Sequence, residues 1–346
     1  MATIAAELGV STASVSNALN RPERVSAGLR QRVLAVATRL GYAGPAAATR
    51  LLASGRADAI AVLFTAELPT ALQDPAAMAF LGGISVVCES AGLSLVLIPD
   101  RSTQPGGRAA AVAEAIVDGF VVYSLRDGDP LLDVVLQRDV STVVIDAPRT
   151  VSGADWVGAD DRTAMRGLGD HLRKLGHREV GIIAPQLNET RLNGPVEPGR
   201  WSESGYALMR ERIEGLLAGL HLDASAVVVE ERFQADLAAG ADALNALLQR
   251  RPGVTAVCCL TDVLALGALA AARQRGVVIP DQLTITGYDD IPAAAHEGLT
   301  TIAQQHAAKG RVAGEMLLTA STQAIDRRRL LPTQLQIRAS AGRANR

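Results

Sequence analysis

The chain has few of the features that disulfide frameworks and membrane spans require. Its 346 residues include only three cysteines, too few for the paired framework of a small secreted domain. Two of them, Cys258 and Cys259, lie inside the apolar run 254–260, where we expect ordinary core residues. No apolar run reaches the roughly 18 residues of a membrane span, and the N-terminus has no secretion signal. We therefore expect a cytoplasmic protein.

The usual motifs of catalysis and cofactor binding are also missing. The sequence has no glycine-rich dinucleotide loop after its first expected strand, no P-loop, no His-Glu-x-x-His motif and no Gly-x-Ser-x-Gly elbow. The five histidines are scattered along the chain. We expect no cofactor, no metal and no enzymatic activity.

Charge is sparse but unevenly divided. Residues 1–56 hold seven Arg, no Lys and two Glu, whereas the rest of the chain is acidic, for a net charge of −2. A basic N-terminal module on an acidic body is typical of a nucleic-acid partner, although a solvated basic surface has the same composition. With 48% hydrophobic and 20% charged residues, a chain of this length predicts a soluble protein of two or three domains.

The N-terminal module is organised around residues 9–20. Gly9 allows a tight turn, and Ser11 is a suitable N-cap for the helix that follows. The helix has one apolar face, formed by Val15, Ala18 and Leu19, and one face of small side chains, formed by Thr12, Ala13, Ser16 and Asn17. With a first helix over residues 2–8, this pattern predicts either a helix-turn-helix that enters a DNA major groove or an ordinary corner between two helices.

A third helix extends the unit to about 45 residues, a size typical of DNA-reading modules. Ser26 is expected to cap it, and apolar residues recur at helical spacing from Leu29 to Leu40. The unit resembles the headpiece of lactose-repressor (LacI/GalR) family regulators. The motifs that carry the resemblance are Gly9-Val10-Ser11-Thr12-Ala13-Ser14-Val15-Ser16-Asn17-Ala18-Leu19-Asn20, Arg24-Val25-Ser26 and Leu40-Gly41-Tyr42.

The resemblance implies how the headpiece contacts double-stranded operator DNA. It assigns base edges to Thr12, Ala13 and Asn17. It assigns phosphate contacts to the short hydroxyl and amide side chains, namely Ser11, Ser14, Ser16, Asn20 and Ser26, and it adds Arg24 to the interface. Many family members carry Arg or His where this chain has Asn17, so the base preference is not inherited.

Residues 46–56 are either an inert linker or a helix too short to be stable alone. The resemblance implies the second, a hinge helix that forms on operator DNA and places one leucine from each subunit in the minor groove. Leu52 matches this leucine when counted back from Gly55, and Leu51 is the alternative.

After residue 59, apolar strand-like runs alternate with helix-length segments, which predicts parallel sheets covered on both faces. Strands are expected at 60–64, 93–98, 119–123, 142–145, 180–184, 226–229, 256–260 and 283–286. The resemblance implies a periplasmic-binding-protein-like core of two doubly wound lobes. We expect a headpiece at 1–44, a hinge at 45–58 and a core at 59–338. The expected first lobe is 59–159 with 290–321, and the second is 160–289 with 322–338, with crossings near 159–161, 289–292 and 321.

Ligands in such sheets bind at the carboxyl ends of the strands, here between the lobes. The resemblance implies an effector site built from Arg212, from Thr261 in Leu260-Thr261-Asp262, from Asp289 and from Gln304, and Asp146 ends another expected strand. Arginine, aspartate and amide groups suit a sugar-like ligand. Ordinary roles remain open: Arg212 as a surface residue, Asp262 as a helix cap and Asp290 as part of a crossing.

Together these features predict a homodimeric transcriptional repressor switched by a small carbohydrate. The short C-terminus has no apolar heptads, so we expect no tetramer-forming coiled coil. A cytoplasmic sugar-binding protein without a DNA role is the alternative. An enzyme on the same scaffold is a third reading that no motif supports.

Overall fold

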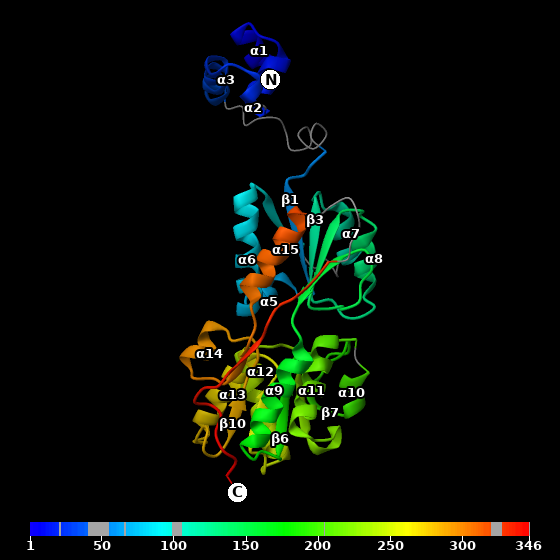
Figure 1. Cartoon of the computed structure of the whole chain (residues 1–346), viewed down its shortest axis with the longest axis vertical. Helices are drawn as coiled ribbons and strands as arrows, with labels where there is room; N and C mark the ends of the chain where they lie inside the picture. The colour runs from blue at the N-terminus through cyan, green and yellow to red at the C-terminus, as the bar shows by residue number, and fades with distance from the viewer. Residues whose placement is uncertain are drawn as a thin grey trace. The chain divides into compact units, whose positions relative to one another are not determined.

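The computed structural model describes residues 1–20, 22–40, 55–65, 67–98, 106–203, 205–319 and 327–345. The chain divides into two compact units, Met1–Asp58 with Ile116–Asp118 and Ala59–Ala115 with Gly119–Arg346 (Figure 1). Within the described ranges, no helix combines the length and apolarity needed to cross a membrane.

The first unit contains a three-helix bundle. Its elements are α1 (Ala2–Leu8), α2 (Thr12–Asn20), the 3-10 helix η1 (Pro22–Arg24) and α3 (Ala27–Arg39). Buried apolar residues from all three α-helices form the core: Ile4, Ala5, Val15, Ala18, Val33, Val36 and Ala37. Gly9 ends α1 with a φ of 64°, a conformation that glycine adopts without strain. The Ser11 hydroxyl accepts the Ser14 amide, so its predicted capping role is confirmed.

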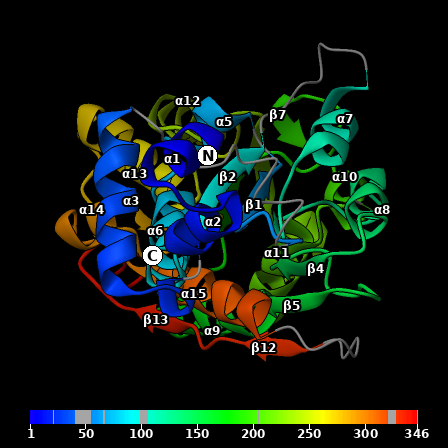
Figure 2. The ribbon, with the colours of Figure 1, turned by 90° about the horizontal axis from the view of Figure 1, so that it is seen from above.

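The second unit has two lobes, and the first is built on a six-stranded parallel sheet. Its strands in order are β12 (Arg328–Leu330), β5 (Asp155–Gly158), β4 (Ser141–Ile145), β3 (Gly119–Tyr123), β1 (Ala59–Phe64) and β2 (Ser94–Ile98). Its helices are α5 (Leu68–Ala71), α6 (Pro75–Ala91), α7 (Gly107–Glu114), α8 (Pro130–Leu136) and α15 (His306–Leu318). Figure 2 shows β12 beside β5, although their sequences are far apart.

The second lobe is built on a five-stranded sheet. Its order is β10 (Thr284–Thr286), β9 (Ala256–Cys259), β6 (Val180–Ala184), β8 (Val228–Arg232) and β7 (Asn193–Val196), in which only β7 runs antiparallel to its neighbour. Its helices are α9 (Asp161–Lys174), α10 (Pro198–Ser202), α11 (Ala207–Leu220), η2 (Ala224–Ala226), α12 (Leu237–Arg250), α13 (Asp262–Gln274) and α14 (Pro292–His296). A separate two-stranded sheet pairs β11 (Thr301–Ala303) with β13 (Gln334–Gln336).

The second sheet is covered on both faces, as its apolar strands predict. Cys258 and Cys259 belong to the hydrophobic clusters on opposite sides of the sheet, and neither is exposed. Their predicted place in the core is confirmed. The first sheet has a comparable cluster that includes Val62, Phe80 and Met316.

Glycines bring paired helices into close contact. A Cβ on Gly310 of α15 would lie 2.1 Å from the Phe80 carbonyl of α6, and a Cβ on Gly219 of α11 would lie 2.1 Å from the Arg166 carbonyl of α9. The helices therefore approach at distances that side chains larger than hydrogen would prevent.

The chain crosses between the lobes later than expected in two of three places. The first crossing lies between β5 and α9. We expected the second at 289–292, but Asp289 donates its amide to Ile302, α14 packs on α13, and the first lobe resumes only at α15. We expected residues 322–338 in the second lobe, yet β12 pairs with β5 of the first, next to Arg327, which is held by Asp155.

Candidate DNA interface and effector site

The exposed face of α2 carries the residues that we expect to read bases. Ser11, Thr12 and Ala13 are exposed and Asn17 is half-buried, whereas Val15 on the opposite face is fully buried. Because α2 buries its other face against the bundle, these short side chains point away from the bundle. Short side chains let the helix approach a base edge closely.

Part of the expected phosphate-binding set also stabilises the headpiece itself. The Ser11 and Ser14 hydroxyls lie 2.9 Å apart, and the Ser26 hydroxyl caps α3 by accepting the Leu29 amide at 3.3 Å. Ser16 is half-buried and Arg24 is exposed. The Asn20 side chain, Leu51 and Leu52 lie outside the described residues, so their roles stay predictions.

A cavity of about 310 Å³ lies where the two lobes of the core meet. It is formed by the start of α6, the segment that follows β10, and the start of α15. The lining residues are Pro75, Ala76, Ala79, Asp289, Asp290, Ile291, Pro292, Gln304, Gln305, His306, Ala307, Ala308 and Arg311. Two of the five expected effector residues, Asp289 and Gln304, are among them.

A chain of polar contacts connects these two residues to a third. The Gln304 amide nitrogen lies 3.1 Å from Asp289 Oδ1, and the Gln304 amide oxygen accepts from Lys309 Nζ at 2.5 Å. Lys309 Nζ also lies 2.6 Å from Asp146 Oδ1. The structure thus links Asp146, Gln304 and Asp289 through a fully buried lysine that sequence reasoning missed.

Both aspartates in this chain of contacts have backbone conformations that residues other than glycine rarely adopt. The φ angle is 62° at Asp146 and 124° at Asp289. Such strain costs of order 1–3 kcal/mol at each position and concentrates at functional sites. The strained backbone supports both residues as candidates for the effector site.

His306 is a second residue that sequence reasoning missed. Its side chain is 8% exposed, its Nε2 lies 3.4 Å from Asp289 Oδ1, and neither ring nitrogen has a hydrogen-bond partner among the described residues. Buried polar atoms are normally paired, so His306, which lines the cavity beside Asp289, is a candidate contact for a ligand.

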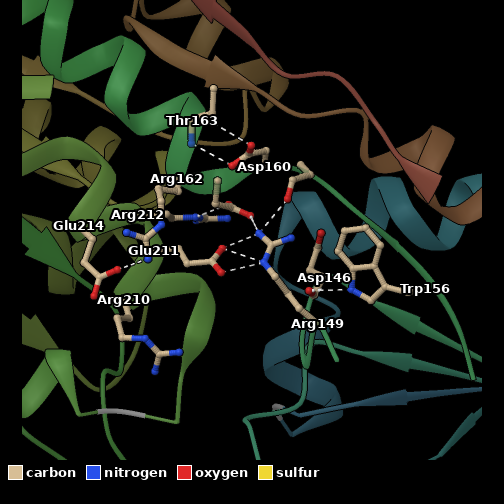
Figure 3. A network of polar contacts seen from close by, with 12 residues as sticks. Asp146, Arg149, Trp156, Asp160, Arg162, Thr163, Arg210, Glu211, Arg212 and Glu214 are labelled. Carbon is tan, nitrogen blue, oxygen red and sulfur yellow. Dashed lines mark hydrogen bonds and ion pairs between the residues drawn. The ribbon is translucent and has the colours of Figure 1, made fainter. Parts of the chain in front are cut away.

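Arg212 is buried rather than on the surface, with 4% of the residue exposed. Its Nε donates to Asp161 Oδ1 at 2.9 Å, its Nη1 donates to the Leu260 carbonyl at 2.6 Å, and its Cζ lies 3.7 Å from the centre of the Tyr288 ring. Burial opposes the charge, but Asp161, Tyr288 and Asp289 raise the pKa of Arg212 above its ordinary value. Figure 3 shows Arg212 in a network of polar contacts that also includes Arg149 and Glu211.

Thr261, rather than Asp262, caps the helix that follows β9. The Thr261 hydroxyl caps α13 by accepting the Leu264 amide, whereas Asp262, expected as the cap, is the first buried residue of the helix. Asp262 accepts the Ile291 amide at 3.0 Å and the Thr301 hydroxyl at 2.6 Å. Burial, with the charge of Asp289, raises the pKa of Asp262 to about 7. Asp290, left open as part of a crossing, pairs with Arg338 at 2.7 Å.

Both units have counterparts among known proteins. Residues 1–44 match the bacterial regulatory proteins of the lacI family, and residues 169–341 match the periplasmic binding protein-like domain. An HTH-type transcriptional regulator of Mycobacterium tuberculosis is 41% identical over 348 residues, covering 99% of this chain and 96% of its own. The HTH-type transcriptional regulator IpsA of Corynebacterium glutamicum is 36% identical over 324 residues, covering 92% and 90%.

Solved structures give the same result. A LacI-family regulator from Corynebacterium glutamicum has a TM-score of 0.74 and 33% identity, with 98% of both chains covered. The lac repressor dimer bound to operator has a TM-score of 0.78 at 23% identity, again over 98% of both chains, a likeness of fold alone.

A helix-turn-helix unit joined to a periplasmic-binding-protein-like core defines a DNA-binding transcriptional regulator. The chain belongs to the LacI family of bacterial regulatory proteins.

Proposed function

We propose that the protein is a homodimeric repressor that acts in the cytoplasm on a pseudo-palindromic operator. In each subunit α2 enters the major groove, with Thr12, Ala13 and Asn17 at base edges and Ser11, Ser14, Ser16, Asn20, Arg24 and Ser26 at phosphates. A leucine of the hinge, Leu52, enters the minor groove. The observation that carries this proposal is the outward face of α2, where short polar side chains lie opposite a buried apolar face.

We further propose that a small polyhydroxylated ligand, a sugar or sugar derivative, changes operator affinity without being transformed. Its site comprises Asp146, Arg212, Thr261, Asp289 and Gln304, extended by His306. Support comes from the linked contacts of Asp146, Lys309, Gln304 and Asp289 beside the cavity. Carboxylate oxygens and the His306 imidazole offer acceptors and donors to hydroxyl groups.

Selection of genomic DNA fragments by the purified protein tests the DNA role. The expected result is enrichment of one pseudo-palindrome, bound roughly 10³-fold more tightly than random DNA. Failure to enrich any sequence, together with retained sugar binding, would favour the sugar-binding alternative.

The selected fragment then tests the switch. Operator affinity is measured alone and with ribose, cellobiose and other sugars and polyols; ribose and cellobiose are present in solved structures of this fold. A ligand that lowers affinity is an inducer, and one that raises affinity is a co-repressor. A ligand that binds the core by calorimetry yet leaves operator affinity unchanged would contradict the proposed coupling.

A further inference from the structure

Arg149 connects the two lobes through a contact with Glu211, and neither residue lines the cavity described above. It lies between β4 and β5 of the first lobe, and its partner Glu211 lies on α11 of the second. Arg149 Nε is 2.8 Å from each Glu211 carboxylate oxygen, and Arg149 Nη2 is 2.5 Å from Glu211 Oε2. This is a two-pronged arginine–carboxylate contact, the strongest geometry for such a pair.

The same guanidinium reaches the carboxylate that holds Arg212. Arg149 Nη2 lies 3.3 Å from Asp161 Oδ2, and Arg212 Nε lies 2.9 Å from Asp161 Oδ1. Asp161 is 1% exposed, and both of its oxygens face arginines. Burial raises the pKa of Asp161, but the charges of Arg212 and Lys309 outweigh it, so this pKa lies below its ordinary value.

Two residues of the first lobe, Trp156 and Arg328, hold Arg149 in position. The Arg149 guanidinium lies 5.4 Å from the Trp156 ring centre, and Arg328 of β12 lies 4.4 Å from the same ring. Arg328 also donates to the Arg149 carbonyl at 2.6 Å. The indole nitrogen of Trp156 donates to the carbonyl of Asp146, which belongs to the proposed effector site. These contacts hold Arg149 to the first lobe, and Figure 3 shows its guanidinium facing Glu211 of the second lobe.

We propose that Arg149 is a positioning residue that couples the arrangement of the lobes to the effector site through Asp161. A two-pronged contact requires donor–acceptor distances near 3 Å, so even a small separation of the lobes breaks it. Asp161 then loses one of its two arginine partners, and the electrostatic surroundings of Arg212 change. The proposal rests on the effector role of Arg212 proposed above. By reciprocity, a ligand that binds at Arg212 more tightly in one lobe arrangement shifts the chain toward that arrangement.

Arg162 provides a matched control. It is the residue after Asp161, and it pairs with Glu214 on the same helix as Glu211. Both partners of this pair belong to the second lobe, so its loss removes an arginine–carboxylate contact without disconnecting the lobes.

The test measures the distance between the lobes without any ligand. Spin labels are placed at Asp133→Cys on α8 and Lys174→Cys on α9, both exposed positions, and labelled protein is diluted with unlabelled protein so that only distances within one chain contribute. We expect one narrow distribution for the parent and for Arg162→Ala. For Arg149→Ala we expect a distance distribution that is shifted or has two maxima. Arg149→Lys, which retains the charge but not the fork, should give an intermediate result.

Hydrogen exchange tests whether the contact between Arg149 and Asp161 affects the surroundings of Arg212. Amide exchange over 207–214 and 286–290 should rise about tenfold in Arg149→Ala and remain at the parent rate in Arg162→Ala. A parent-like distance distribution in Arg149→Ala overturns the interlobe contact, and parent-like exchange overturns the link to Arg212. If Arg149→Ala does not fold, Arg149→Lys decides in the same way. Neither readout uses DNA or ligand, so failure here is distinct from failure of the regulator proposal.

Discussion

Lys309 Nζ lies 2.6 Å from Asp146 Oδ1, and the lysine is fully buried. One end of this pair follows β4 and the other lies on α15, so the contact fixes the helix against the strand that carries Asp146. A buried charge that loses its partner is strongly destabilising.

Lys309→Met should therefore lower the free energy of unfolding by about 3–5 kcal/mol, because the buried Asp146 carboxylate loses its cation. Chemical denaturation measures the change. Lys174 is the only other lysine in the chain and is exposed, so Lys174→Met is the matched control and should be near neutral. Equal stabilities of the two variants would contradict the buried ion pair.

Asp262 should make stability depend on pH below neutrality. Its pKa is raised to about 7 by burial, whereas an unfolded aspartate titrates near 3.9. Between these values the folded chain holds a proton that the unfolded chain has released, so the free energy of unfolding falls as pH rises from about 4 to 7.

Asp262→Asn removes this titration and should flatten the dependence over the same pH range. Asp281→Asn, at an exposed position, is the control and should leave the parent slope intact. Denaturation curves at pH 4, 5, 6 and 7 provide the measurement. An unchanged slope in Asp262→Asn would show that another group titrates there.

Leu52→Ala should reduce specific affinity and DNA bending together. A leucine wedge unstacks one base step at a cost of a few kcal/mol, which the contacts of the bent complex repay. Core folding and sugar binding should be unaffected. Gel shifts with circularly permuted operator fragments measure the bend. An unchanged bend would contradict the wedge role of Leu52, and Leu51→Ala would then be tested in the same way.

Asp289→Asn should bind operator like the parent in the absence of ligand but respond weakly to it. Loss of a buried, charge-assisted contact costs on the order of 2–5 kcal/mol of ligand affinity. Calorimetry and operator affinity with and without ligand provide the check. Arg212→Ala is less informative, because it leaves the buried Asp161 carboxylate without its closest arginine. A full response in Asp289→Asn would exclude this residue as a ligand anchor.

Most of the regular core could be predicted from the sequence because its strands are long apolar runs. The segments that were missed are short and lack this signal. β7 reads Asn-Gly-Pro-Val and resembles a turn, and β5 has only four residues. β11, β12 and β13 have three residues each; β11 is largely buried, whereas β12 is exposed and β13 is polar. Their pairing comes from tertiary contacts, such as Arg327 on Asp155, which periodicity does not detect.

Sequence alone named candidates by two signals and missed residues whose partners are remote. Asp146 was named because it ends an expected strand, and Arg212 and Asp289 because their motifs resemble those of the family. Lys309 lies among small residues on a helix and resembles a surface lysine until Asp146, 163 positions away, is folded against it. His306 likewise gives no local signal, because its importance lies in the cavity wall that it forms.

The central claim is that α2 reads base sequence, and parallel selection with the parent and with Asn17→Ala tests it most directly. The account predicts that both enrich related pseudo-palindromes but differ in the preferred base at one position of each half-site, at a cost of roughly 1–3 kcal/mol for the parental base pair. Ser16→Ala, which changes an expected phosphate contact, should weaken all sequences about equally. If Asn17→Ala selects the same sequences in the same rank order as the parent, the assignment of Asn17 to base reading is wrong.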